Sequence, residues 1–91
     1  MPSVGDTQYV VVSPTRVLDR GLYDDVIVSL CRPSTYCHIR FWSDPQMVPS
    51  GTELTNAHRA ASSARYIFNP RTGQRQLLWN CRLVNKPGEC F

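Results

Sequence analysis

Apolar residues along the chain fall into short runs that are separated by turns rich in proline, glycine and serine. The runs at 7–12, 24–32 and 35–44 are rich in β-branched and aromatic residues, which extended strands favour. The segment 32–35 supplies turn residues between the second and third runs. We therefore predict three strands, of which 24–32 and 35–44 pair as a β-hairpin.

A disulfide fits the register of this hairpin. If Cys31 lies opposite Cys37, neighbouring residues pair in order along the ladder. The pairs expected on one face are Leu30 with His38, Val28 with Arg40 and Val26 with Trp42. Opposite β-carbons lie roughly 4.5–5.5 Å apart, and the closer type of pair can accept a disulfide. The pattern makes Cys31–Cys37 a candidate disulfide and gives the strand apolar neighbours on both faces.

The spacing of apolar residues changes after a proline-containing loop at 44–53. Between residues 52 and 68 they recur at steps of three and four, which is the pattern of an amphipathic helix. Thr52 or Thr55 supplies its N-cap. Because the apolar stripe is mostly alanine, we expect this helix to approach the sheet closely.

A second hairpin is expected in the C-terminal part. The turn at 69–73 combines a proline with a glycine, and it separates the apolar run 65–68 from the alternating run 74–84. A further turn at 86–88 brings Cys90 back toward Cys81. Cys81–Cys90 is therefore the second candidate disulfide.

These elements define an α+β fold in the order β-β-β-α-β-β. We expect a twisted antiparallel sheet of four to five strands with one helix packed on one face. A chain of 91 residues, 42% of them hydrophobic, suits a single compact domain spanning 1–91.

Composition bears on compartment and cofactors. No run approaches the roughly 18 consecutive apolar residues of a membrane-spanning helix, and the first residues lack the regions of a signal peptide. We expect a soluble, cytoplasmic protein with no membrane partner, although an exported mature form fits the same sequence. The four cysteines fit disulfides or reduced thiols. Their C-x5-C and C-x8-C spacings depart from structural zinc sites, so no metal or other cofactor is predicted.

Charge is distributed unevenly. Residues 1–53 carry four arginines and six acidic residues, whereas 54–91 carry five arginines, Lys86 and a single acid, Glu89. Arginine favours bidentate contacts with carboxylate or phosphate groups. The second half therefore suits contact with an acidic partner, including the first half of another copy.

The segment 35–42 carries the most distinctive candidate site. Alternation on a strand places Tyr36, His38, Arg40 and Trp42 on one face and Cys37, Ile39 and Phe41 on the other. The first set is a candidate binding surface, as is the loop 44–53. Base stacking combined with phosphate contacts would make the same face a nucleic-acid platform. The net charge of only +3 argues against nucleic acid as the main ligand.

An enzymatic alternative uses the two histidines. His38 and His58 would act as general base and general acid, with Arg40 or Arg59 holding a phosphate, as in a nuclease-like enzyme. The chain contains no nucleophile motif, glycine-rich phosphate loop or C-x-x-C redox motif.

We therefore expect a small, non-catalytic binding or interaction module. Because one helix cannot cover two apolar sheet faces, we also expect self-association as a homo-dimer or higher oligomer. Its further partner would be a protein or small molecule that the sequence does not identify.

Overall fold

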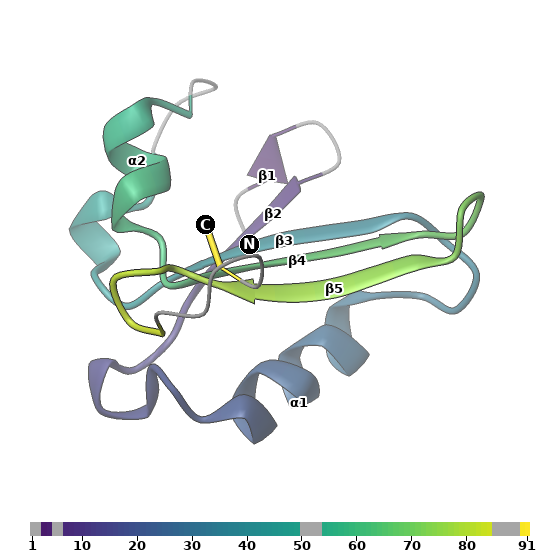
Figure 1. Cartoon of the computed structure of the whole chain (residues 1–91), viewed down its shortest axis with the longest axis horizontal. Coiled ribbons are helices and arrows are strands. Elements are labelled where there is room, and N and C mark those ends of the chain that lie inside the picture. The colour runs from purple at the N-terminus through teal and green to yellow at the C-terminus, as the bar shows by residue number, and fades with distance from the viewer. Residues whose placement is uncertain (1–2, 5–6, 50–53, 85–89) are drawn as a thin grey trace.

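A five-stranded sheet forms the centre of the computed structural model, which describes residues 3–4, 7–49, 54–84 and 90–91 (Figure 1). The strands lie side by side in chain order: β1 (Ser3–Val4), β2 (Thr7–Val11), β3 (Cys37–Trp42), β4 (Ala64–Asn69) and β5 (Gln74–Trp79). The helical elements are η1 (Pro14–Arg16), α1 (Arg20–Leu30), η2 (Pro45–Met47) and α2 (Asn56–Ala61). Helix α1 lies along one face of the sheet, and α2 lies on the other side (Figure 1).

The predicted α+β class is confirmed, with a sheet of five strands and the main helix packed on one face. One strand pair departs from the antiparallel expectation. Strand β2 runs parallel to β3, with Tyr9 beside Arg40, while the other three pairs are antiparallel. A parallel pair needs a crossover connection, and α1 provides it.

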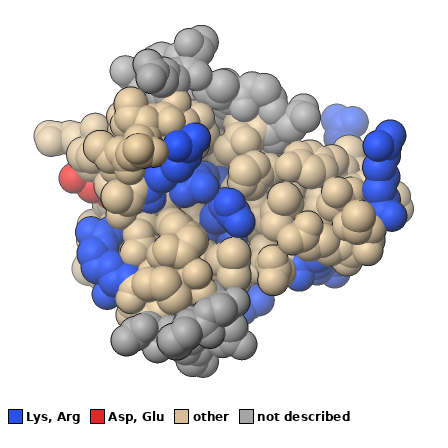
Figure 2. All heavy atoms as spheres, turned by 45° about the horizontal axis from the view of Figure 1, so that its top comes forward, with Lys and Arg blue, Asp and Glu red and all other residues tan. Residues whose placement is uncertain are grey.

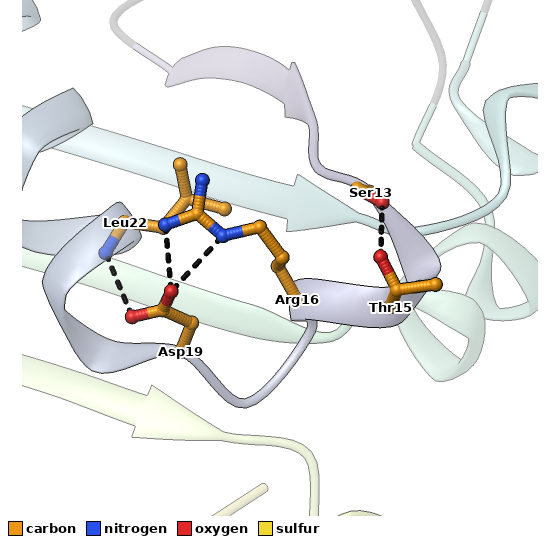
Figure 3. Close-up of polar contacts among 5 residues, drawn as sticks. All are labelled: Ser13, Thr15, Arg16, Asp19 and Leu22. Carbon is orange, nitrogen blue, oxygen red and sulfur yellow. Dashed lines mark hydrogen bonds and ion pairs between the residues drawn. The ribbon is translucent and has the colours of Figure 1, made fainter.

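The prediction of a strand at 24–32 is wrong, because residues 24–30 belong to helix α1. Asp19 caps the helix by accepting a hydrogen bond from the Leu22 backbone NH at 3.3 Å, and Arg16 donates to the same carboxylate (Figure 3). Tyr23, Ile27 and Leu30 then follow at steps of four and three and pack on the core. This helical stripe, together with the cap, overrides the strand preference of the Val-Ile-Val run.

Because this segment is not a strand, the predicted hairpin and its register are also wrong. His38, Arg40 and Trp42 do not face Leu30, Val28 and Val26; β3 pairs instead with β2 and β4. Cys31 is the C-terminal cap of α1 and Cys37 begins β3, and their Cα atoms are 5.6 Å apart in a disulfide. The predicted cysteine pair is therefore correct, although it links a helix to a strand.

The amphipathic helix expected between 52 and 68 is reduced to α2, six residues long. Thr55 caps it, as predicted, while Thr52 and the end of the loop 44–53 lie outside the described residues. The helix ends at Ser62, whose side chain donates to the Arg59 carbonyl at 2.6 Å. Beyond it, Tyr66 and Ile67 favour extended structure and lie in β4.

The core lies between α1 and the sheet. Tyr23 is fully buried, with edge-to-face contacts to Phe41 at 4.6 Å and Trp79 at 4.8 Å between ring centroids. Its hydroxyl donates to the Val17 carbonyl at 2.7 Å and lies 3.1 Å from the Ser63 hydroxyl. The deepest aromatic side chain of α1 is thus satisfied in hydrogen bonding as well as packing.

Strand β5 ends at Trp79, earlier than the predicted 74–84 strand. Cys81 and Cys90 form the second expected disulfide, with Cα atoms 4.9 Å apart; the predicted turn at 86–88 lies outside the described residues. Cys90 makes a parallel bridge with Trp79, and the Phe91 backbone NH donates to the Trp79 carbonyl at 3.0 Å.

Among the described residues, no helix has the length and apolar character needed to cross a membrane.

Candidate functional site

The sheet face opposite α1 gathers cationic side chains from two neighbouring strands. In the parallel and antiparallel registers, one row across the sheet consists of Tyr9, Arg40, Arg65 and Leu78. Partners in register point to the same face, so the two arginines are direct neighbours. We call His38, Arg40 and Arg65 the cationic cluster.

Arg40 is the most deeply placed member of the cationic cluster. It is 5% exposed, and its Nη1 donates to the Ser62 hydroxyl at 3.0 Å. The Phe91 ring covers its guanidinium, with Cζ 5.3 Å from the ring centroid. Burial, followed by the charges of Arg65 and Arg59, lowers the pKa of Arg40 to about 10. The side chain therefore stays positively charged at neutral pH although it is almost fully buried.

Arg65 lies directly across from Arg40 on β4 and is half-buried. Like charges that face each other across two strands destabilise the pair. The Nε atoms of both arginines are inaccessible to solvent and make no hydrogen bond within the described chain. Two positive charges therefore lie side by side here, with no counter-charge from the residues that the structure describes.

His38 lies one pair further along β3. Its Nδ1 is 3.0 Å from the Thr7 hydroxyl, while its Nε2 is buried and has no hydrogen-bond partner among the described residues. Burial, with smaller contributions from Arg65 and Arg40, lowers its pKa to about 4. The ring is therefore neutral at pH 7, and when Thr7 donates to Nδ1 the single proton of the ring lies on the buried Nε2.

The other two residues of the predicted binding face differ strongly in exposure. Tyr36 precedes β3 and is 41% exposed. Trp42 is fully buried against the edge of Tyr9, and its indole NH donates to the His58 carbonyl at 2.9 Å. Trp42 is consequently a packing residue and offers no open ring for a base to stack on.

Side chains from the sheet and from the segment after β5 hold the last turn of α2 over this face. Its carbonyls accept hydrogen bonds from Trp42, Asn80 and Arg82, at His58, Ala60 and Ala61 respectively. These carbonyls have no partner within a helix that ends there. The contacts fix α2 beside the cationic cluster and bring Arg59 near it.

His58 serves the start of α2. Its Nδ1 accepts a hydrogen bond from the Thr55 backbone NH, and its own backbone NH donates to the Thr55 hydroxyl, each at 3.2 Å. The His58 backbone lies at the Trp42 end of β3, and four residues of strand, roughly 13 Å, separate Trp42 from His38. No described hydrogen bond joins the two imidazoles that the enzymatic alternative requires.

Counter-charges of the described residues lie elsewhere. Their ion pairs, Arg16–Asp19 and Arg20–Asp24, are both at the N-terminal part of α1. Seen from the α2 side, arginine or lysine atoms gather in the middle of the surface, while acidic atoms show at its left margin (Figure 2). Within the described ranges, no three His, Cys, Asp or Glu side chains group as metal ligands do. The chemistry of the cationic cluster therefore suits an anionic group.

Sequence reasoning found His38 and Arg40 but missed Arg65, Tyr9 and Phe91. The predicted second hairpin is confirmed, since β4 pairs antiparallel with β5, but Arg65 was not selected because its segment also overlapped the helix expected at 52–68. The contact of Phe91 with Arg40 depends on the fold of the C-terminal segment, for which local patterns carry no signal. The described part of the loop 44–53 contains η2, which Asp44 caps through the Gln46 backbone NH.

No family model, curated protein or solved structure matches this chain.

Proposed function

We propose that the protein is a non-catalytic binding module that recognises an anionic group with its cationic cluster. The observation that carries the proposal is the pairing of Arg40 with Arg65 on one sheet face, where one nitrogen each of His38, Arg40 and Arg65 is buried without a hydrogen-bond partner in the described chain. Buried polar nitrogens are normally hydrogen-bonded, and buried charges are normally paired. An anion bound at the accessible atoms above them would compensate the charge of the two arginines.

The energetic argument rests on Arg40. A buried charge that lacks a partner costs several kcal/mol, because it has lost its water without gaining a counter-charge. An anion near the cluster offsets this cost and the repulsion between Arg40 and Arg65. Arg65 is partly accessible and Arg59 and Arg82 are exposed, so these three provide the direct donors while Arg40 adds charge beneath them.

The state of the histidines supports binding over catalysis. With its pKa lowered to about 4, His38 is almost never in the cationic form that a histidine general acid needs at neutral pH. His58 uses its Nδ1 in the cap of α2. A neutral His38 beneath the arginines adds no positive charge of its own, and its role there is to pack and to bond with Thr7.

Ligand size and oligomeric state are finer points of the proposal. A small anion or an acidic side chain of a protein partner fits a cluster of this size, whereas a nucleic acid needs a longer basic track. Self-association as a homo-dimer or higher oligomer stays a prediction. The exposed apolar residues that support it are Val11, Leu18, Val28 and Tyr36.

Titration with inorganic phosphate, followed by amide NMR at constant ionic strength, tests the proposal. We expect saturable shifts concentrated in β3 and β4, because the cluster lies on those strands. Arg65→Gln should weaken phosphate binding by about tenfold or more, since a charge-assisted contact contributes roughly 1.5–3 kcal/mol. Chloride at equal ionic strength should leave these resonances unchanged.

Arg71→Gln is the matched control, because it removes the same charge from the exposed β4–β5 turn. It should bind phosphate as the unmodified chain does. Without phosphate, Arg40→Met should be more stable than the unmodified chain, with a free energy of unfolding higher by about 1–3 kcal/mol. Phosphate should no longer stabilise this variant. If Arg65→Gln and Arg71→Gln weaken phosphate binding equally, the effect comes from the overall charge of the protein, and the proposed site is refuted.

A further inference from the structure

A second concave surface lies on the α1 side of the sheet, away from the cationic cluster. Helix α1 covers only part of its face, and two adjoining hollows of about 320 Å³ each remain between the helix and the β4–β5 hairpin. Ile27, Val28, Tyr66 and Arg75 line both hollows. They therefore form one continuous groove, which we call the helix–hairpin groove.

The lining of the helix–hairpin groove is mostly apolar. Ile27 and Tyr66 are shared by both hollows, Leu77 closes the first and Phe68 belongs to the second. Val28, on the helix side, is 79% exposed. An exposed aliphatic side chain beside a hollow with apolar walls is typical of a surface that receives an apolar group.

The charged groups of the groove are unbalanced in sign. Arg20 pairs with Asp24 at 3.3 Å, but Arg32 and Arg75 form no ion pair among the described residues. The guanidinium of Arg75 lies over the Phe68 ring, 4.9 Å from its centroid. That contact holds a cation directly beside the apolar wall.

Apolar walls together with unpaired arginines select for an amphipathic anion. An apolar body gains from burial against Ile27, Phe68 and Leu77, and an acidic head gains from Arg75 or Arg32. A simple inorganic anion would leave the walls unused, and a cationic amphiphile would meet repulsion. These two requirements separate this groove from the cationic cluster, which lies on the opposite face of the sheet.

We propose that the helix–hairpin groove binds a small amphipathic carboxylate, whose head pairs with Arg75 and whose hydrocarbon body lies between α1 and the hairpin. The ligand class is a single-headed acid with an aliphatic body, such as a medium-chain fatty acid. This site is independent of the phosphate site proposed above.

Decanoate, decylammonium and acetate are the probes for a methyl and amide NMR titration of the intact, oxidised chain below the micelle concentration. We expect decanoate to shift the resonances of Ile27, Val28 and Leu77 in a saturable manner. Decylammonium should bind at least about tenfold more weakly, because it reverses the head-group charge beside the arginines. Acetate should produce no shift at the apolar walls.

Two pairs of variants locate the site. Arg75→Gln should weaken decanoate binding by about fivefold, whereas Arg71→Gln in the adjoining turn should not change it. Val28→Asp places a like charge at the groove and should weaken binding, while Ser29→Asp adds the same charge to the same helix outside the groove. Both helix positions are exposed, so the fold should tolerate either change.

Equal binding of decanoate and decylammonium would overturn the proposal, because the arginines would then have no role. Decanoate shifts that map to His38 and Arg40 instead of the groove would also overturn it. Phosphate binding at the cationic cluster is measured separately, so failure of either site leaves the other result interpretable.

Discussion

The two faces of the sheet differ in the polarity of the side chains that they bury. On the α1 face, Tyr23, Phe41 and Trp79 pack edge to face around a core in which no charged side chain is buried among the described residues. On the other face, Arg40 and Arg65 lie together with buried nitrogens that have no partner. Because alternate residues of β3 point to the two faces, this strand contributes Phe41 to the aromatic core and Arg40 to the cationic cluster.

Removal of an aromatic side chain from the α1 face should have the largest effect. Phe41→Ala deletes a fully buried ring that contacts Tyr23, and we expect a loss of about 3–5 kcal/mol in the free energy of unfolding. Urea unfolding measures it. The adjacent change Arg40→Met, on the opposite face, should act with the opposite sign, and a comparable loss there would contradict the contrast between the faces.

Acid should lower the free energy of unfolding through His38, which lies on the face opposite α1. Its pKa is about 4 when folded and 6.5 when unfolded, so between these values the unfolded chain binds a proton that the folded chain does not. Stability should therefore fall as the pH decreases from about 6.5 to about 4, by roughly 1–2 kcal/mol after allowance for solvent screening.

Urea unfolding at several pH values, with His38→Gln as the comparison, measures this contribution. The variant cannot titrate and should lose most of the pH dependence within the window. Asp19 acts elsewhere, because its hydrogen bond with Arg16 lowers its pKa below 3.8 and its contribution disappears only at lower pH. An unchanged pH profile in His38→Gln would show that the histidine is not the titrating group.

The smallest effect is expected at the start of α2. Thr55→Ala removes the hydroxyl that accepts from the His58 backbone NH, at a cost of about 1 kcal/mol. Asn56→Ala, one residue further, changes an exposed side chain and should stay within about 0.5 kcal/mol. A loss at Thr55 as large as that of Phe41→Ala would mean that α2 organises the whole opposite face.

The sequence allowed prediction of features that depend on local alternation or on covalent reach. The two faces of β3 and both cysteine pairs belong to this group. The helical nature of 20–30 was not recognised, because its β-branched run has strand propensity while the cap at Asp19 lies outside that run. The parallel pairing of β2 with β3 spans about thirty positions, and local patterns contain no information on such contacts.

The candidate site was predictable only in part for the same reason. His38 and Arg40 stood out as polar residues in an apolar strand. Their environment did not, since it depends on Arg65 across the ladder and on Phe91 from the end of the described chain. The burial of Trp42 follows from the position of α2, which no residue near Trp42 specifies.

The disulfide between Cys81 and Cys90 also affects the tendency of the protein to aggregate. Strand β5 is the last strand of the sheet, and exposed edge strands pair readily with strands of other molecules. The disulfide holds residues 90–91 against the end of β5, where the Cys81 backbone NH donates to the Phe91 carbonyl at 2.8 Å. Residues 90–91 therefore cover the Trp79 end of this edge, which leaves less of the apolar segment Leu77 to Trp79 free to pair with another molecule in a fibre. The rest of the edge presents the polar residues Gln74, Arg75 and Gln76 to solvent.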